Sequence, residues 1–527
     1  MNKFNQNKKI QFFLNPDIRI RVISSILGNI ARGGINLLSG ILVARSLGPS
    51  EYGNYNFLLC SFVAINRLID MGTSSAFFTF ISKQKRGIKF YLYYILWMLI
   101  QFVFIIFFIF ILMPENWIKK IWLGHEMKII LLAFIASFSM NQIWNMVASI
   151  GESLRATIGV QLRNVGISVA FICCLLVLIY MNMISVINLF ILNIVLYLTF
   201  SAIFLSYIKD MIVDIKEETF QNIFKEFKEY CTPLIVSVWV SHLYLLADTW
   251  FLQNFGGSTE QGYYSIAEKF SAVSLIATTS ILKVFWKEIS FSSLYHDIIR
   301  IKGLYFKTVR RLFFLSAFIS CFLIPYSKEI LFTFLGKNYV SAWLAFSLML
   351  ILPIFQTIGQ INGTFFYATS NTKTLRDIIV FMSIISIPLS YFLLANSSAP
   401  IPGLDLGATG LALKMIILTV ININIRTYMI TKLYKWQFTY IYQIIDPVLL
   451  IGCSYLIKKF LNLFFAYLGF KLSLIPLIFI SFLLYLIIII ILILKFPNLF
   501  SLKKDDLVYL FKYLIEKVFY KNIKPKA

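Results

Sequence analysis

Residues 483–494 read LLYLIIIIILIL, an unbroken run of apolar and aromatic side chains, and residues 104–112 read FIIFFIFIL. Neither run alternates between apolar and polar positions, as the strands of a membrane β-barrel do. Runs that extend toward the roughly 20 apolar residues needed to cross about 30 Å of hydrocarbon are typical of spanning helices. The sequence therefore predicts an all-helical integral membrane protein.

The composition supports this class along the whole chain. Of the 527 residues, 59% are hydrophobic and only 14% are charged, which lies outside the range of soluble globular domains. Apolar segments of spanning length recur from residue 22 to residue 495. We predict fourteen transmembrane helices, at residues 22–44, 55–79, 90–113, 129–150, 159–180, 184–207, 233–254, 262–286, 310–327, 342–368, 377–395, 407–428, 442–465 and 472–494.

The formal charge of +24 is explained by how the basic residues are distributed between the loops. Most of the 48 lysines and arginines fall in alternate loops and in the two terminal segments. Because loops rich in Lys and Arg stay on the cytoplasmic side, both termini are predicted to be cytoplasmic. The excess of basic residues then requires no nucleic-acid partner, and the protein is expected to be surrounded by membrane lipid.

A polar segment divides the predicted spans. Within it Phe220, Ile223, Phe224 and Phe227 recur at helical spacing, which predicts an amphipathic helix on the membrane surface. The predicted organisation has five parts. They are an N-lobe of spans 1–6 (residues 1–207), an amphipathic cytoplasmic linker (208–232), a C-lobe of spans 7–12 (233–428), two further spans (429–495) and an amphipathic cytoplasmic tail (496–527).

A short pattern repeats across this division. Residues 48–55 contain G-x4-G-x-Y and residues 256–264 contain G-x5-G-x-Y, so one insertion relates the two copies at an offset of about 208 residues. Each copy joins an odd-numbered span to an even-numbered one. Six-helix halves that enter the membrane from the same side are parallel repeats, which predicts two lobes around a central cavity.

Ionisable side chains inside the spans are the candidate functional residues. Each costs about 2.5 to 3.5 kcal/mol near the middle of a membrane helix, so it requires water, an ion or a partner. The cations are Arg32, Arg67, Arg163, Lys269, Lys283 and Lys414, and the acids are Asp70, Asp248 and Glu268. The excess of cations predicts an anionic substrate.

The depth of each charge separates the cations. Arg163 and Lys283 lie near the cytoplasmic ends of their spans, where long side chains reach the interface without any functional role. Arg32 and Arg67 lie deep in spans 1 and 2, and Lys269 and Lys414 lie in from the external side. Two explanations remain open for this deep group: ion pairs with the acids inside the membrane, or a hydrated cationic cavity.

The residue types indicate a phosphate ligand. Arg binds phosphate oxygens through a bidentate fork and Lys binds them as a point charge, so a diphosphate would suit the cavity. The expected substrate-binding residues are Arg32, Arg67, Arg163, Lys269, Lys414, Gln356 and Gln360. The amides of Gln356 and Gln360, with those of Asn362, Asn422 and Asn424, could contact sugar hydroxyls, or else form hydrogen bonds between helices.

The acids Asp70, Asp248 and Glu268 are candidate sites for a coupling proton or sodium ion. A salt bridge between the lobes is the alternative for each. No G-x4-G-K-S/T loop and no nucleophile motif occurs, and the three histidines are scattered. The sequence thus predicts a transporter driven by a gradient or by downhill flow, without enzymatic activity, cofactor or metal.

Several short motifs resemble those of polysaccharide-repeat flippases in the multidrug/oligosaccharidyl-lipid/polysaccharide exporter superfamily. The most family-like is ARSLGPSEYGNY at residues 44–55, and DMG at residues 70–72 is similar. CTPL at residues 231–234, GYY at residues 262–264 and LGKNY at residues 335–339 extend the resemblance toward span 12.

The resemblance implies a two-lobed bundle that flips an undecaprenyl-diphosphate-linked oligosaccharide, of O-antigen or capsule type, by alternating access in the bacterial inner membrane. It also implies that spans 1, 2, 7 and 8 border the cavity and that a glycan polymerase is a candidate partner. Related branches export drugs by cation coupling or flip the lipid-linked peptidoglycan precursor. A drug exporter would need an acidic cavity, whereas a membrane polymerase would need a large external domain.

Overall fold

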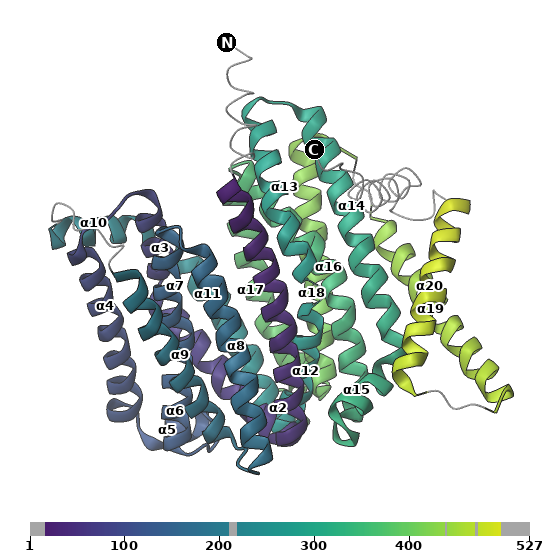
Figure 1. The fold of residues 1–527 in the computed structure, drawn as a ribbon, viewed down its shortest axis with the longest axis horizontal. Helices are drawn as coiled ribbons and strands as arrows, with labels where there is room; N and C mark the ends of the chain where they lie inside the picture. The colour runs from purple at the N-terminus through teal and green to yellow at the C-terminus, as the bar shows by residue number, and fades with distance from the viewer. Residues whose placement is uncertain (1–15, 210–218, 274, 438–439, 470–472, 497–527) are drawn as a thin grey trace, which may run out of the picture. The chain divides into compact units, whose positions relative to one another are not determined.

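The computed structural model describes residues 16–209, 219–273, 275–437, 440–469 and 473–496. Within these ranges all regular structure is helical, which confirms the predicted class (Figure 1). Contacts divide the chain into unit 1, residues 1–269 and 379–411, and unit 2, residues 270–378 and 412–527. The predicted lobe boundaries stay a prediction, and the amphipathic tail predicted from residue 496 onward lies almost wholly outside the described residues.

Unit 1 contains most of the first half of the chain and one later helix. Its helices are α2 (Pro16–Asp70), α3 (Thr73–Lys83), α4 (Ile88–Ile106), α5 (Glu115–Ile121), α6 (Met127–Phe138), α7 (Trp144–Ser153), α8 (Thr157–Tyr180), α9 (Val186–Ile208), α10 (Phe220–Cys231), α11 (Ile235–Phe251), α12 (Gly257–Val273) and, from residue 379, α17 (Thr372–Leu394). Three π-helical segments follow α4, α6 and α11, namely η1 (Phe107–Leu112), η2 (Ser139–Ile143) and η4 (Leu252–Gly256).

Helix α2 holds predicted span 1 and the first part of predicted span 2 in two arms, and span 2 continues into α3. It is 55 residues long and is interrupted at Gly48, whose φ of 78° and ψ of 169° are not helical. Pro49 follows, and it lies in the first turn of the second arm, where its missing N–H costs nothing. Gly257, between η4 and α12, has nearly the same conformation, with φ 79° and ψ 177°.

The matching conformations correct the predicted alignment of the repeat. Gly257, and not Gly256, corresponds to Gly48, so residues 257–264 follow the pattern of residues 48–55 without an insertion. The one-residue error arose because the sequence offers two adjacent glycines. Only the backbone shows which of them has the positive φ.

The two repeated turns contact each other reciprocally within unit 1. A Cβ atom on Gly53 would lie 1.8 Å from the carbonyl oxygen of Ser258, and one on Gly262 would lie 2.0 Å from that of Pro49. The hydroxyls of Ser50 and Ser258 are 2.6 Å apart. Only glycine allows backbones to approach so closely, which explains the two glycines of the pattern.

Helix α10 contains the four residues on which the predicted amphipathic linker helix was based. Ile223 is buried and the Phe227 ring packs 5.2 Å from that of Phe80, whereas Phe220 and Phe224 are exposed. Figure 1 shows α10 lying across the ends of α3 and α4. Its exposed phenylalanines are the side expected to enter the headgroup region.

Unit 2 contains the later spans. Its helices are α13 (Ile276–Leu294), α14 (Ile298–Leu323), α15 (Ser327–Leu335), α16 (Trp343–Ala368), α18 (Gly407–Leu433, from residue 412), α19 (Tyr442–Tyr467) and α20 (Leu474–Lys495), with short 3₁₀ segments η5 (Ile324–Tyr326) and η6 (Lys337–Ala342). Helix α14 packs against α16 and α19, and α19 packs against α20.

Among the described residues, 11 helical segments are long and apolar enough to cross a membrane. The difference from fourteen has local causes. Predicted spans 1 and 2 merge in α2. Predicted span 7 is α11, which has only 17 residues before its π-helical extension, and span 8 is divided near residue 274 between α12 and α13.

Candidate functional site

Three cations of unit 1 lie at successive depths along the helices. Counted at 1.5 Å per residue from the turn at Gly48, Arg32 lies about 24 Å along one arm of α2 and Arg67 about 28 Å along the other. Lys269 lies about 18 Å along α12 from the matching turn at Gly257. All three side chains are partly exposed. Within the part of the chain that the structure describes, none of them forms a salt bridge.

Arg32 lies on the face of α2 that meets α8. Its neighbours one turn away are Gly28, whose Cβ position is 2.9 Å from the Gln161 Oε1 atom, and Asn36, which accepts a hydrogen bond of 2.9 Å from Ser168. Gln161 Oε1 is buried without a hydrogen-bond partner among the described residues. Polar side chains therefore line this interface on both sides of the guanidinium.

Lys269 lies against α2. Its ammonium is 5.2 Å from the centre of the Tyr52 ring, and its Nζ atom is 3.3 Å from the Cβ position of Gly40. A cation over an aromatic face is stabilised by about 0.5 to 2 kcal/mol, according to its exposure. The lysine is thus held between two points of α2, whereas the adjacent Glu268 is exposed.

Asp70, a predicted ion-coupling residue, is the last residue of α2 and lies three positions before the start of α3. Its carboxylate accepts hydrogen bonds from the Thr73 hydroxyl at 2.8 Å and from the Ser74 amide and hydroxyl at 3.1 and 2.7 Å. It is 3% exposed. A carboxylate in this position satisfies the free N–H groups of a helix N-terminus, so the contacts describe a cap.

A polar network that the sequence analysis missed surrounds this cap. Gln142, in η2, accepts from Ser74 and donates to the Asn66 carbonyl oxygen, and the Asn66 amide donates to Ser137 at 3.2 Å. All these groups are polar residues within apolar spans. That signal could have identified them, since buried polar groups need partners.

Asp248 pairs with a serine of α17. Ser390 donates to its Oδ1 atom at 2.5 Å and also to the Ser386 carbonyl oxygen at 2.8 Å. Asp248 is 5% exposed. The two helices are far apart in sequence, so the predicted position of Asp248 inside span 7 gave no indication of this partner.

Arg163 packs against aromatic rings at one end of α8. Its guanidinium lies 4.5 Å from the Phe204 ring centre and 4.8 Å from that of Tyr207, and it donates to the Gly159 carbonyl oxygen at 3.2 Å. These contacts are the packing role expected near a span end. The side chain of Lys283 lies outside those that the structure describes.

Unit 2 holds the remaining predicted residues. Lys414 is fully buried in α18. Gln356 and Gln360, both on α16, are partly exposed, and the Gln360 Oε1 atom is buried without a hydrogen-bond partner among the described residues. Asn422 Oδ1 is in the same situation on α18. These orphan acceptors leave hydrogen-bonding capacity for a ligand or for water.

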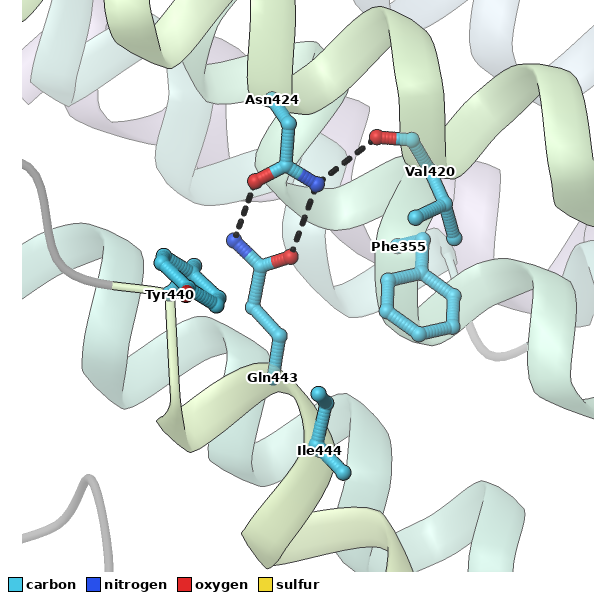
Figure 2. Close-up of a pocket in the computed structure, with 6 residues that line it drawn as sticks. All are labelled: Phe355, Val420, Asn424, Tyr440, Gln443 and Ile444. Atoms are coloured by element: carbon cyan, nitrogen blue, oxygen red, sulfur yellow. Dashed lines mark hydrogen bonds between the residues drawn. The ribbon is translucent and has the colours of Figure 1, made fainter.

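Two of the predicted sugar contacts instead join helices. Asn362 is fully buried, accepts from Tyr305 at 2.7 Å and donates to Thr427 at 2.9 Å. Figure 2 shows Asn424 and Gln443 exchanging amide hydrogen bonds of 3.2 and 3.4 Å beside a cavity of about 320 Å³. Helix-to-helix bonding, the alternative considered for these amides, is what both pairs show.

Unit 2 also contains charges that were not among the predicted site residues. Arg310 lies well inside α14, 5.7 Å from the Tyr442 ring centre, because α14 begins at Ile298 and not near residue 310 as predicted. Arg426 of α18 donates to the Gly359 carbonyl oxygen at 3.4 Å. Asp446 of α19 is fully buried.

Among the described residues, no group of three or more His, Cys, Asp or Glu side chains lies close enough together to hold a metal ion. Unit 1 carries cations with water-accessible surface, and unit 2, taken by itself, carries unsatisfied amide oxygens. Such groups bind and orient an anionic, hydroxyl-bearing molecule. They do not form a nucleophile with its base.

The family described as Polysaccharide biosynthesis protein matches residues 20–285, about half of the chain. The chain belongs to this family. It is a multi-pass membrane protein of a polysaccharide biosynthesis family, and its fold is similar to that of solved multidrug exporters and of MurJ. Both the predicted family and the predicted non-enzymatic class are confirmed.

Solved structures share the fold at low identity. The lipid II flippase MurJ, in an inward closed conformation, gives a TM-score of 0.64 at 18% identity, with 91% of this chain and 100% of that chain covered. An inward-facing multidrug resistance MATE transporter of the MOP superfamily gives a TM-score of 0.61 at 14% identity, with 77% of this chain and 96% of that chain covered. A MOP superfamily transporter from Pyrococcus furiosus gives a TM-score of 0.53 at 12% identity, with 79% of this chain and 96% of that chain covered. None of the curated proteins compared matches the sequence.

Proposed function

We propose that the protein flips an undecaprenyl-diphosphate-linked oligosaccharide repeat unit, of O-antigen or capsule type, from the inner to the outer leaflet of the bacterial cytoplasmic membrane. Family membership supplies the polysaccharide pathway. The observation that carries the substrate class is the series Lys269, Arg32 and Arg67, three cations in unit 1 that form no salt bridge within the described chain. Both termini face the cytoplasm in this proposal.

The three side chains match a diphosphate chemically. An unpaired ion in hydrocarbon carries a penalty of tens of kcal/mol in the idealised limit, so a diphosphate cannot cross unaided. Arg32 and Arg67 offer forks for its oxygens, and Lys269 adds a point charge nearer the turns. Partial exposure keeps these cations hydrated until the ligand replaces the water.

Amides of unit 2 are proposed separately as sugar-binding groups. Gln356 and Gln360 remain in the proposal because the Oε1 atom of Gln360 has no protein partner among the described residues. Lys414 and Arg163 fit it less well, since Lys414 is fully buried and Arg163 is packed on Phe204. Among the acids, Asp248 is the candidate for ion coupling, because Asp70 caps α3.

The test reconstitutes purified protein in liposomes with an undecaprenyl-diphosphate oligosaccharide and measures how fast the glycan becomes accessible to an impermeant reagent. Arg32→Gln and Arg67→Gln should each slow flipping roughly tenfold or more, the cost of losing a hydrogen bond to a charged group. Arg32→Lys and Arg67→Lys keep the positive charge but lose the bidentate fork, so their flipping rates should lie between those of the wild type and of the Gln variants. The exposed Lys120 of α5 provides the control Lys120→Gln.

Unchanged flipping by folded Arg32→Gln and Arg67→Gln variants would exclude the diphosphate role. The same liposomes distinguish the alternatives. Preferential transport of a lipophilic cation would identify a drug exporter, and preference for a lipid-linked peptidoglycan precursor over the oligosaccharide would identify a precursor flippase. The fold alone favours neither of these.

A further inference from the structure

A second basic site lies in unit 1, away from the series of deep cations. A cavity of about 630 Å³ opens between the end of α3, the start of α4 and the end of α7. Its volume lies within the range of small-molecule sites. Four of its ten lining residues are basic, namely Lys83, Lys85, Arg86 and Arg155, and none is acidic.

The four cations are held differently. Arg86 is 5% exposed, forms a 2.9 Å ion pair with Glu226 of α10 and lies 4.9 Å from the Phe90 ring centre. It therefore fixes the floor of the cavity. Lys83, Lys85 and Arg155 are exposed, and none of them forms a salt bridge within the described chain. Three exposed cations thus line the cavity together with one buried cation.

The backbone adds to the positive potential. Helix α4 begins at Ile88 and α8 begins at Thr157, and neither N-terminus has a side-chain hydrogen bond at its cap. Both adjoin lining residues of the cavity, Arg86 and Arg155. Helix N-termini carry partial positive charge and free N–H groups, which favour anions.

The depth of the cavity follows from α10. Its Phe227 contacts α3 and α4 and its Glu226 pairs with Arg86. Its Phe220 and Phe224 are exposed, which is the arrangement of a helix lying in the headgroup layer. The cavity shares Arg86 with this contact, so it lies at the same level. It is on the side where the positive-inside rule places the cytoplasm.

We propose that this cavity is a phosphate-binding site at the inner surface of the membrane, distinct from the transport path and taking the headgroup of an anionic phospholipid or a free diphosphate. Basic pockets between helices on the cytoplasmic side bind such headgroups, and each Lys or Arg near the surface contributes about 1 kcal/mol. The proposal does not depend on which molecule the protein transports.

The experiment uses the full chain in detergent. Phosphatidylglycerol or inorganic pyrophosphate is added, and amine acetylation is followed by peptide mass spectrometry. Either probe should protect Lys83 and Lys85 but not Lys119 and Lys120, which are exposed on α5. Protection by phosphatidylglycerol alone identifies a lipid site, and protection by pyrophosphate identifies a site for the free anion.

Variants supply the second measurement, the number of phosphatidylglycerol molecules retained in native mass spectrometry. The triple variant Lys83→Ala, Lys85→Ala and Arg155→Ala should bind roughly a hundredfold more weakly, at about fivefold for each basic residue. The matched control removes three exposed lysines of unit 1: Lys119, Lys120 and Lys128. Equal retention by the two triple variants, or acetylation of Lys83 and Lys85 that neither probe slows, would overturn the proposal.

Discussion

Gly53 and Ser258 approach each other so closely that a Cβ on the glycine would lie 1.8 Å from the serine carbonyl oxygen. The contact is made by backbone atoms on both sides, so neither can turn away as a flexible side chain would. Gly262 and Pro49 form the reciprocal contact. The two copies of the repeated turn therefore fix each other at one end of unit 1.

Gly53→Ala should consequently destabilise the protein. Inserting one methyl group into a well-packed region costs about 1 to 3 kcal/mol, and a backbone contact of this kind places the cost at or above the upper end. Thermal unfolding in detergent measures the effect. Gly34→Ala is the control, because no atom lies within 4 Å of its Cβ position and alanine favours the helix. Equal melting temperatures for the two variants would contradict the assigned contact.

Glu260 should stabilise the start of α18 from a neighbouring helix. Its Oε2 atom accepts a 2.7 Å hydrogen bond from the Ala408 amide, the role of an N-cap side chain supplied from α12. Glu260→Ala should lower the free energy of unfolding by about 0.5 to 2 kcal/mol. Glu260→Gln keeps an acceptor and should lose less, as measured by thermal unfolding; an equal loss would exclude the cap.

The same residue predicts a pH dependence. Burial raises the pKa of the Glu260 carboxyl, which lies in the turn before predicted span 8. The folded state then binds the proton more tightly than the unfolded state, so its stabilising contribution is complete below the unfolded pKa and is lost as the pH rises through the folded pKa. Glu260→Gln should flatten this decline between mildly acidic and neutral pH. A variant that follows the wild-type curve would show that another group titrates.

The bond between Ser390 and Asp248 predicts two separable effects. Ser390→Ala removes a donor from a buried carboxylate and should cost about 1 to 3 kcal/mol of stability. Asp248→Asn keeps the side-chain shape and should weaken gradient-dependent transport while leaving downhill exchange intact. Flipping by Asp248→Asn liposomes, with and without a proton or sodium gradient, measures the second effect. A full response to the gradient in that variant would remove Asp248 from coupling.

The amides of α16 should divide into structural and functional residues. Asn362 joins Tyr305 to Thr427, so Asn362→Ala leaves several buried groups unsatisfied and should cost about 3 kcal/mol or more. Gln356 has no such bonds among the described residues and is partly exposed, so Gln356→Ala should leave the melting temperature unchanged while slowing glycan flipping. A loss of stability in Gln356→Ala would place it with Asn362.

The spans were predictable because length and apolarity depend only on local sequence. The run at residues 483–494 lies inside α20, and Phe220 to Phe227 lie on α10 as their spacing predicts. The division of span 8 near residue 274 and the start of α14 at Ile298 were not predictable in this way. Both depend on packing that overrides hydropathy at a helix end.

The side chains were less predictable because their partners lie far away in sequence. Asp70 is an exception: Thr73 and Ser74 follow it immediately, and this spacing of a carboxylate and hydroxyls at a helix start could have indicated a cap. Arg163 finds Phe204 on another helix, and Asp248 finds Ser390 142 positions away. No periodicity in one segment specifies such pairs.

The contact units have a consequence for how the polypeptide matures. Unit 1 takes its last residues from positions 379–411, after more than a hundred residues assigned to unit 2 have been synthesised. The ribosome therefore releases an incomplete unit 1 whose Asp248 still lacks Ser390. A fragment that contains Asp248 but ends before residue 379 would never acquire that partner, so severed halves should regain it only when expressed together.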